Sequence, residues 1–474
     1  MTRTRFAPSP TGTPDSIHLG FVIRALWSYA YAKKNNGQFV LRIEDTDQKR
    51  SRKDTEEAIF STLKIFGINW DEGPDIGGPH APYRQSERLE KYKEAAKKLV
   101  ERGFAYYDFD AIAREKEEIK ASYDSKESLA KLKVRPAARN LNIEESVKRV
   151  ESGEPFVVRA KIPEDKIFEY YDWILKKKIK FIGQEVSDLI LLKSDGFPTY
   201  HLAVVVDDID MEITHVFRGQ EWISSTPIHL HVYEGLEQKL PEIGHFSVIL
   251  DPRTGKKFSK RDITSLFGVS TWIDKGYLPH AILNYLMLLG WAPKDNKELF
   301  TLEEFVQSFD QDGVQKSNPV FNSEKLDWFN GQYIRQLTDS ELSKLIFDFY
   351  KGKYDMERVE KLTPLVKDRI KKISDFETLA GYVFEEKESM KITENYSEHV
   401  LAALNAIENI EDWTKENIDR DLLSVVTNNN FKTGKFFQDL RGAIAGSSVT
   451  PPLNDTLLII GKDETLRRLK KSIQ

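Results

Sequence analysis

The N-terminal part of the chain alternates short strand-like segments with a stretch of helical spacing. Residues 4–6 and 39–43 are typical of buried strands. Asn-Asn-Gly at 35–37 is a typical end for a helix between them. A strand, a helix and a strand within about 40 residues predict a βαβ unit and therefore a parallel sheet. The apolar face of this helix comprises Val22, Ala25, Leu26, Tyr29 and Ala30.

The middle of the chain follows a different pattern. Residues 111–185 open with an almost wholly charged stretch, and 156–162 and 179–182 alternate as exposed antiparallel strands do. This pattern predicts an inserted α+β module. Strand-like segments that we expect to complete the parallel sheet return at 188–192, 201–206 and 246–250.

From about residue 265 the spacing becomes helical. Pro279 is placed to begin a helix and Gly290 to end it. Beyond about residue 330, charged amphipathic helices predominate. The expected fold is therefore α/β, a parallel sheet with an α+β insertion, followed by an all-α C-terminal region. The apolar face of the helix at Pro279 comprises Ile282, Tyr285, Leu286 and Leu289.

Composition narrows the possible environments. The chain has 474 residues, 40% hydrophobic and 31% charged, enough for several domains with sizeable cores. With 70 Lys and Arg against 75 Asp and Glu, the net charge is −5, so nucleic acid would be bound through local patches. The absence of cysteine excludes disulfides and thiolate zinc sites. No apolar run reaches the roughly 18 residues of a membrane span and no secretory signal is visible, so we expect a cytoplasmic protein without a membrane partner.

A Pro- and Gly-rich segment at 6–21 joins the first predicted strand to the first predicted helix. The amino end of a helix in this place offers backbone N–H groups and partial positive charge to a phosphate. His18 can donate to a phosphate oxygen, and Gly20 lets a flat base approach the backbone. The alternative is a simple turn with His18 on the surface.

A basic segment occupies residues 255–261. Lys257 and Lys260 could neutralise the charge that develops on a phosphoryl group in transfer. Taken alone, the segment is better explained as a solvated basic loop.

Two further places could bind a small charged substrate. Glu44 follows the second predicted strand, at the edge where open α/β sheets bind ligands, and could hold an ammonium group. Asp45 and Asp47 are better explained as caps of the next helix. Tyr200 and Arg218 could together bind a carboxylate. The histidines interpreted as structural or phosphate-facing, for lack of metal-ligand spacing, are His201, His215, His229 and His231.

Two of these segments resemble a known pair of motifs. His18-Leu-Gly-Phe21 and Lys257-Phe-Ser-Lys-Arg261 are similar to the His-Ile-Gly-His and Lys-Met-Ser-Lys-Ser signatures of class I aminoacyl-tRNA synthetases. With the surrounding segments, the chain resembles the bacterial-type glutamyl-tRNA synthetase almost from end to end. Those segments are 7–12, 42–47, 70–74, 82–88, 198–208, 440–452 and 459–462.

The resemblance implies a Rossmann-like catalytic domain that is interrupted by an insert and followed by helical domains. The implied parts are 1–110 and 188–265 for the two halves of the catalytic domain, 111–187 for a module that binds the tRNA acceptor end, 266–330 for a helical junction that contacts the tRNA stem, and 331–474 for an all-helical anticodon-binding domain.

The resemblance also implies how glutamate is bound. Arg5, helped by Tyr200, would pair with the side-chain carboxylate. Ser9 and Glu44 would hold the amino group. Arg218 would face the region of the α-carboxylate.

For ATP, the resemblance implies that His18 and Gly20 cradle the nucleotide. Lys257 and Lys260 would stabilise the pentacovalent phosphorus, so these lysines and His18 are the implied catalytic residues. Glu221 and Trp222 would line the pocket near the tRNA end and the adenosine. The full implied nucleotide-binding set is His18, Gly20, Trp222, Lys257, Ser259 and Lys260.

The implied reaction consumes ATP with Mg²⁺ and L-glutamate. Glutamyl-adenylate and pyrophosphate form first, and glutamate is then transferred to the 3′ end of glutamate tRNA, with glutamine tRNA as a second candidate acceptor. The implied enzyme is a monomer. Some relatives carry a cysteine zinc site in the insert, but without cysteine no zinc is expected here.

One departure from the family pattern leaves alternatives open. The turn at 13–16 is longer than the pattern, and it either bulges outward or weakens ATP binding. A non-catalytic paralogue, which would bind tRNA or glutamate with an altered ATP site, is therefore the alternative to a ligase. A generic adenylyl transferase is a further alternative, but it would not need residues 330–474.

Overall fold

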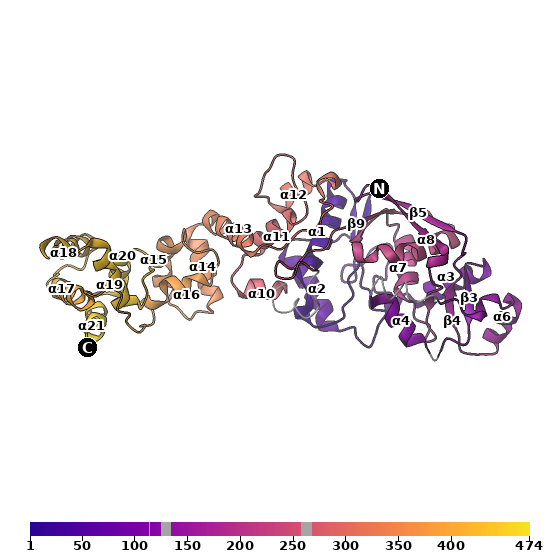
Figure 1. Cartoon of the computed structure of the whole chain (residues 1–474), viewed down its shortest axis with the longest axis horizontal. Coiled ribbons are helices and arrows are strands. Elements are labelled where there is room, and N and C mark those ends of the chain that lie inside the picture. Colours follow the sequence, from indigo (N-terminus) through magenta and orange to yellow (C-terminus); the bar gives the residue numbers. More distant parts are fainter. Residues whose placement is uncertain (113, 125–133, 257–267) are drawn as a thin grey trace. The chain divides into compact units, whose positions relative to one another are not determined.

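The computed structural model describes residues 1–112, 114–124, 134–256 and 268–474. They pack into two compact units (Figure 1). The first is Met1–Thr271 with Leu283–Asn322, and the second is Trp272–Ile282 with Ser323–Gln474. Within the described ranges, no helix combines the length and the apolar character needed to cross a membrane.

The first unit contains a parallel sheet of four strands in the order β2-β1-β8-β9. Its first helix, α1, packs against β1, β2 and β8. The predicted βαβ unit is therefore confirmed. The strands are β1 (Arg3–Phe6), β2 (Gln38–Leu41), β8 (His215–Gly219) and β9 (Glu242–Phe246).

The remaining strands are antiparallel. β3 (Ala105–Asp108), β4 (Val157–Ala160) and β7 (Ile190–Leu192) form a three-stranded sheet, and β5 (Ile167–Asp172) pairs with β6 (Lys177–Ile182) in a hairpin. The prediction that 188–192 belongs to the parallel sheet is wrong, because β7 pairs with β4. The antiparallel strands predicted at 156–162 and 179–182 are confirmed, although β4 is buried instead of exposed.

Residues 201–206 form a helix, and their predicted strand is wrong. They belong to α7 (Tyr200–Asp210), whose residues from 201 to 208 are all buried. A helix buried on all sides has no polar face, so its sequence lacks a helical period and a run of valines is easily taken for a strand. The last strand is displaced as well, since β9 ends at Phe246 where the prediction at 246–250 begins.

The helices of the first unit pack around these sheets (Figure 1). The helix predicted from Pro279 is confirmed as α11. The helices before Ser323, of which α10 and α11 lie partly in the second unit, are α1 (Leu19–Lys34), α2 (Lys53–Ile65), α3 (Leu89–Glu101), α4 (Glu115–Asp124), α6 (Ile143–Glu151), α7 (Tyr200–Asp210), α8 (Thr226–Gly235), α10 (Val269–Asp274), α11 (Pro279–Leu288) and α12 (Leu302–Ser308).

The C-terminal region is helical throughout, as predicted, and appears in orange to yellow in Figure 1. One continuous apolar core, from Ile334 to Leu469, holds its helices together. Thr338 caps the start of α14 in a capping box. Its hydroxyl accepts from the Glu341 N–H, and the Glu341 carboxylate accepts from the Thr338 N–H. The helices are α13 (Ser323–Gln336), α14 (Asp339–Phe349), α15 (Met356–Val366), α16 (Asp375–Ala380), α17 (Tyr396–Glu408), α18 (Lys415–Asn428), α19 (Thr433–Ala445), α20 (Leu453–Ile460) and α21 (Lys462–Ser472).

Candidate active site at the carboxyl edge of the parallel sheet

Charged side chains gather where the parallel strands end. Arg5 lies near the end of β1, Arg218 near the end of β8, and Glu44 three residues beyond β2. Open α/β sheets bind their ligands at this edge, because the strand ends leave a crevice between connections that leave in different directions. This edge of the sheet is therefore the candidate ligand site.

Arg5 is held by a carboxylate of α7. Its Nε lies 3.1 Å from Oδ1 of Asp208, and its Nη1 donates to the carbonyl of Phe217 at 3.4 Å. Arg42, which is fully buried, donates to the same Asp208 oxygen at 2.8 Å. Burial disfavours the charge of Asp208, but Arg5 and Arg42 outweigh burial and hold its pKa below the usual value.

The neighbouring Asp207 binds a second set of buried partners. It accepts from Arg88 Nε at 2.7 Å, from the Tyr92 hydroxyl at 2.9 Å and from the Gln85 amide at 2.8 Å. All four side chains are nearly inaccessible to solvent. Asp207 therefore ties α7 to α3 and to the segment before it.

Glu44 is the one carboxylate here with a raised pKa. Burial raises the pKa of Glu44 to about 7, against the opposing effect of Arg42, whose Nη2 lies 3.3 Å from it, and of Arg5. A carboxylate that is costly to ionise gains most when a cationic ligand group arrives beside it. Glu44 is therefore suited to bind an ammonium group.

Arg218 is held by neutral acceptors. Its Nε donates to His245 Nε2 at 2.8 Å, its Nη1 to His229 Nδ1 at 2.9 Å, and its Nη2 to the Thr226 hydroxyl at 2.7 Å. The guanidinium is only 6% exposed. A guanidinium fixed in this way keeps its positive charge for a ligand carboxylate.

Tyr200 begins α7 and lies among the same charges. Burial raises the pKa of its hydroxyl, whereas Arg218 and Arg5 lower it, which places both arginines close to it. The ring of Trp222 lies 4.4 Å from the Tyr200 ring, between centroids. Because residues seven and eight apart share a helix face, α7 presents Tyr200 and Asp208 toward the same edge of the sheet.

The predicted nucleotide segment lies beside these residues in the chain. His18 is the N-cap of α1, and a Cβ placed on Gly20 would come within 3.1 Å of the His18 ring. The imidazole thus packs directly over Gly20. Ser9 is exposed on the strand-to-helix connection, so its side chain is available to a ligand.

The long turn that departs from the family pattern closes on itself. Residues Pro14–Ser16 form a single 3₁₀ turn, in which the Ser16 N–H and hydroxyl both bond to the carbonyl of Thr13, at 2.8 and 2.5 Å. Thr13 and Asp15 are exposed. The extra residues therefore form a compact turn at the surface that packs against α2.

Comparison with known proteins identifies the family. Residues 1–328 match "tRNA synthetases class I (E and Q), catalytic domain", and residues 333–473 match "Anticodon binding domain". The chain belongs to this synthetase family.

Individual relatives agree with this assignment over their full lengths. The chain is 38% identical to "Glutamate--tRNA ligase" of Thermus thermophilus, covering 100% of both proteins, and 38% identical to that of Acinetobacter baumannii, covering 100% of this chain and 93% of the relative. A crystal structure of the glutamate tRNA ligase of Elizabethkingia meningosepticum, in complex with its amino acid, aligns with a TM-score of 0.84 at 33% identity, covering 100% of this chain and 99% of that one. The class I synthetase fold expected from the sequence is thereby confirmed.

The predicted residues of the second synthetase motif, Lys257, Ser259 and Lys260, lie outside the described residues. The chain enters this motif through a tight turn, in which the Gly255 N–H bonds to the carbonyl of Asp251 at 2.8 Å. Gly255 has a φ of +65°, a backbone conformation that favours glycine.

The two aspartates after Glu44 do not cap the next helix, so that interpretation is wrong. Asp45 accepts from the backbone N–H of Ser86 at 2.8 Å and from its hydroxyl, and so binds a distant segment. Asp47 accepts from the backbone N–H of Arg50 at 3.2 Å, which closes a local turn before α2. Both carboxylates shape the segment that carries Glu44.

The sequence did not reveal the histidine contacts of Arg218. The sequence indicates only a structural or phosphate-facing role for His229, and no motif includes His245. His229 lies on α8 and His245 on β9. No sequence motif joins either histidine with Arg218, so the sequence does not indicate the contact. His231 and His215 instead bind outside the site, to the Phe104 carbonyl and to the Tyr31 hydroxyl.

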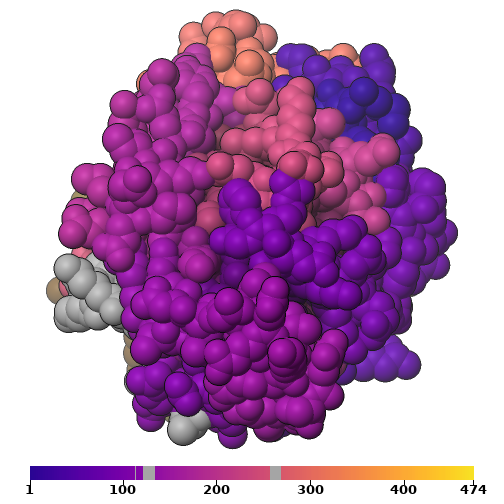
Figure 2. Space-filling model, turned by 90° about the vertical axis from the view of Figure 1, so that its right-hand side faces the viewer, coloured from indigo at the N-terminus to yellow at the C-terminus, as the bar shows by residue number. Residues whose placement is uncertain are grey.

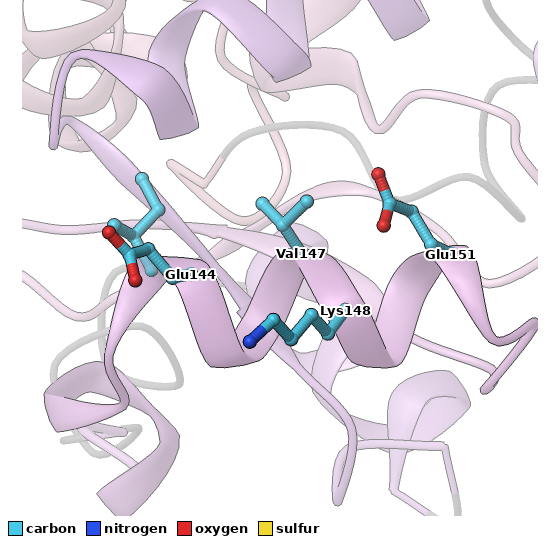
Figure 3. A pocket seen from close by; sticks show the side chains of 5 residues that line it. Glu144, Val147, Lys148 and Glu151 are labelled. Atoms are coloured by element: carbon cyan, nitrogen blue, oxygen red, sulfur yellow. The ribbon is translucent and has the colours of Figure 1, made fainter.

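Purple to magenta residues, among them those of the predicted insert at 111–187, cover much of the face seen in Figure 2. A shallow hollow of about 350 Å³ lies on one side of α6 (Figure 3). It is lined by one helix alone and contains none of the predicted site residues. The lining residues are Ile143, Glu144, Val147, Lys148 and Glu151.

Proposed function

We propose that this chain works as an ATP-dependent glutamate–tRNA ligase through the residues at the carboxyl edge of its parallel sheet. One observation carries the proposal. Arg5, Glu44, Tyr200 and Arg218 lie at a single sheet edge, in a chain that matches glutamate–tRNA ligases over its whole length.

The charges of this edge are complementary to those of an α-amino dicarboxylate. Glu44 would bind the ammonium group, with Ser9 beside it. Arg218 would bind the α-carboxylate region, and Arg5 with Tyr200 the side-chain carboxylate. Glutamine would place a neutral amide against Arg5 and leave the guanidinium poorly paired, which favours glutamate.

The first chemical step is the attack of the glutamate α-carboxylate on the α-phosphorus of ATP. Pyrophosphate leaves, and the terminal ribose hydroxyl of tRNA then attacks the acyl carbon and releases AMP. No nucleophile from the protein is needed, so the protein contributes positioning and charge. In this scheme His18 and Gly20 cradle the nucleotide, and Trp222 and Glu221 line the pocket of the adenosine and the tRNA end.

The second motif would act on the phosphates. We assign Lys257 and Lys260 to the charge on the transferring phosphorus, with Ser259 at the nucleotide. Mg²⁺ neutralises phosphate charge when it is bound. Since the described residues contain no group of three carboxylates or histidines placed for a metal, the ion would be held largely through the phosphates of ATP.

The other regions of the chain would hold the tRNA. We assign the acceptor end to residues 111–187, the stem to 266–330 and the anticodon to 331–474. The matched anticodon-binding family supports the last assignment. We further propose a monomeric enzyme, with glutamine tRNA as a second candidate acceptor.

Charging of total bacterial tRNA with labelled glutamate, with the labelled tRNA species resolved, tests the proposal. Label on glutamate tRNA alone indicates a discriminating ligase. Label on glutamine tRNA as well indicates a non-discriminating one. The absence of any label, with tRNA binding intact, would overturn the ligase in favour of a non-catalytic paralogue.

The Lys260→Ala variant separates chemistry from binding. A ligase is expected to lose roughly 100- to 1,000-fold in kcat, because a cation aimed at the reacting phosphoryl group is removed. Its affinity for tRNA should stay unchanged. Lys256→Ala removes an exposed neighbouring charge and serves as the matched control.

A further inference from the structure

Arg218 differs from the other buried arginines of the first unit in the chemistry of its partners. Each of its three nitrogens donates to an uncharged acceptor, on His245, His229 or Thr226. Arg3, Arg42 and Arg88, by contrast, are held by carboxylates. Among the residues that the structure describes, no ion pair is found for Arg218. Its neutral partners fix its orientation and leave its charge uncompensated.

The acceptor on His245 depends on the tautomer of the imidazole. Arginine can only donate, so His245 Nε2 must carry its lone pair toward Arg218, and the ring proton must be on Nδ1. Oδ2 of Asp172 lies 2.7 Å from Nδ1 and accepts this proton. The Tyr170 hydroxyl also lies 3.3 Å from Nδ1. Asp172 therefore selects the tautomer that Arg218 requires.

The backbone keeps Asp172 in place. Its Oδ1 accepts from the N–H groups of Ile174 and Leu175, at 3.2 and 2.9 Å, in the turn that follows β5. This turn lies against β9, since a Cβ on Gly244 would come within 2.6 Å of the Ile174 side chain. Asp172 and His245 are both fully buried. The carboxylate can thus neither turn away nor exchange its partner for water.

We propose that Asp172 and His245 are positioning residues, which orient the Arg218 guanidinium for the carboxylate of the amino-acid substrate by fixing one imidazole tautomer. The proposal rests on the proposed function, in which Arg218 binds glutamate. Neither residue touches the substrate in this scheme. Their effect passes through Arg218 alone.

Electrostatics support neutral imidazoles in this place. Burial lowers the pKa of His245 to about 4 despite its hydrogen bond to Asp172, and Arg218 lowers it further. Burial and the charge of Arg218 also lower the pKa of His229 well below the usual value. At neutral pH both rings keep the lone pairs that Arg218 needs.

Asp172→Asn is the most informative variant. The amide oxygen would stay with the N–H groups of the turn, which leaves the amide NH₂ facing His245 Nδ1. A donor in this place favours the other tautomer, whose Nε2–H would then point at the Nε–H of Arg218. We expect the KM for glutamate to rise roughly 10- to 100-fold, with the KM for ATP unchanged.

Variants of His245 test the same contact independently. Glutamine can present its amide oxygen where Nε2 lies, so His245→Gln should restore most of the affinity that His245→Ala loses. In the His245→Gln background, Asp172→Asn should add little, because no tautomer remains to be selected. His231→Gln is the matched control, since His231 is equally buried but bonds to the Phe104 carbonyl.

The outcomes separate the two proposals. Arg218→Ala should raise the glutamate KM, and if it does not, the proposed role of Arg218 itself is wrong. If Arg218→Ala raises it while Asp172→Asn and His245→Ala leave it near wild type, Asp172 and His245 are merely structural and the inference falls. An equal rise in the KM values for ATP and glutamate would also overturn it. Thermal unfolding of each variant identifies those that are simply misfolded. The comparison of His245→Gln with His245→Ala then decides whether His245 positions Arg218.

Discussion

The first unit contains two buried clusters that differ in the partners of their arginines, which are carboxylates in one cluster and uncharged groups in the other. In the aspartate cluster, Asp207 and Asp208 of α7 bind Arg42 and Arg88 through ion pairs. Asp208 also pairs with Arg5, the one arginine of this cluster to which we assign a ligand. In the histidine cluster, Arg218 is bound by His245, His229 and Thr226. Asp172 binds His245 and is linked to Arg218 through that ring. Both clusters are nearly closed to solvent.

The difference indicates what each cluster is for. Burying a charge is costly, and a paired carboxylate removes most of that cost, so the aspartate cluster stabilises the fold. Neutral acceptors satisfy hydrogen bonds without cancelling charge. The charge of Arg218 in the histidine cluster is therefore not cancelled by a carboxylate, which fits its proposed role in binding a carboxylate of the substrate.

Asp207→Asn should produce the largest change in stability. It removes the buried partner charge of Arg88 in a site closed to solvent, and we expect a loss of about 3–5 kcal/mol in the free energy of unfolding. Asp210→Asn is the control, because Asp210 binds the same Arg88 at 2.5 Å but is 31% exposed, and it should cost about 1 kcal/mol or less. Denaturant titration measures both. Equal losses would show that the aspartate cluster is not distinguished by its burial.

Glu44→Gln should separate stability from function. Its pKa is raised from 4.5 to about 7, so the folded state binds this proton more tightly and wild-type stability falls as the pH rises from 4.5 through 7. The variant lacks this loss and should be more stable at pH 8 by about 1–3 kcal/mol, with little difference at pH 4.5.

The same variant should be a poor enzyme. Without the carboxylate, the ammonium group of glutamate loses its charged partner, and kcat/KM for glutamate should fall roughly 100-fold. Charging kinetics and unfolding at the two pH values check the pair of effects. Normal kinetics in Glu44→Gln would remove Glu44 from the binding site.

Thr226→Val should have a smaller effect, confined to the histidine cluster. It deletes the acceptor of Arg218 Nη2 and keeps the shape of the side chain, so the KM for glutamate should rise roughly 5- to 10-fold. Thr226→Ser restores the hydroxyl and should restore the KM. If valine and serine behave alike, this hydroxyl does not orient Arg218.

Deletion of Pro14–Ser16 should have the smallest effect. The turn is closed by its own hydrogen bonds and lies at the surface, so its removal should change the KM for ATP by less than about threefold. ATP titration in the charging reaction measures this. A rise above about tenfold would connect the turn to the nucleotide site.

The fold was predictable where local patterns and global packing agree. The βαβ unit around Val22 and the helices after residue 330 carry clear periods, and both were confirmed. The pattern failed at α7, where burial on all sides erases the helical period. β7 was predicted to belong to the wrong sheet, because its pairing with the distant strand β4 leaves no local pattern in the sequence.

The site was predictable only in part, for a related reason. Glu44 and Tyr200 lie in segments that resemble family motifs, and the resemblance of the whole chain implies roles for Arg5 and Arg218 as well. Asp172 and His245 reach Arg218 only after a hairpin folds onto β9. The residues next to them in the sequence do not indicate this contact, which only the three-dimensional structure shows.

A crystal structure of the enzyme with bound glutamate is the most direct test of the proposed binding site. We expect a carboxylate of glutamate in hydrogen-bond contact with Arg218, the ammonium group beside Glu44, and the Asp172–His245–Arg218 contacts unchanged. Glutamate bound elsewhere, or with its carboxylates away from Arg218, would contradict it.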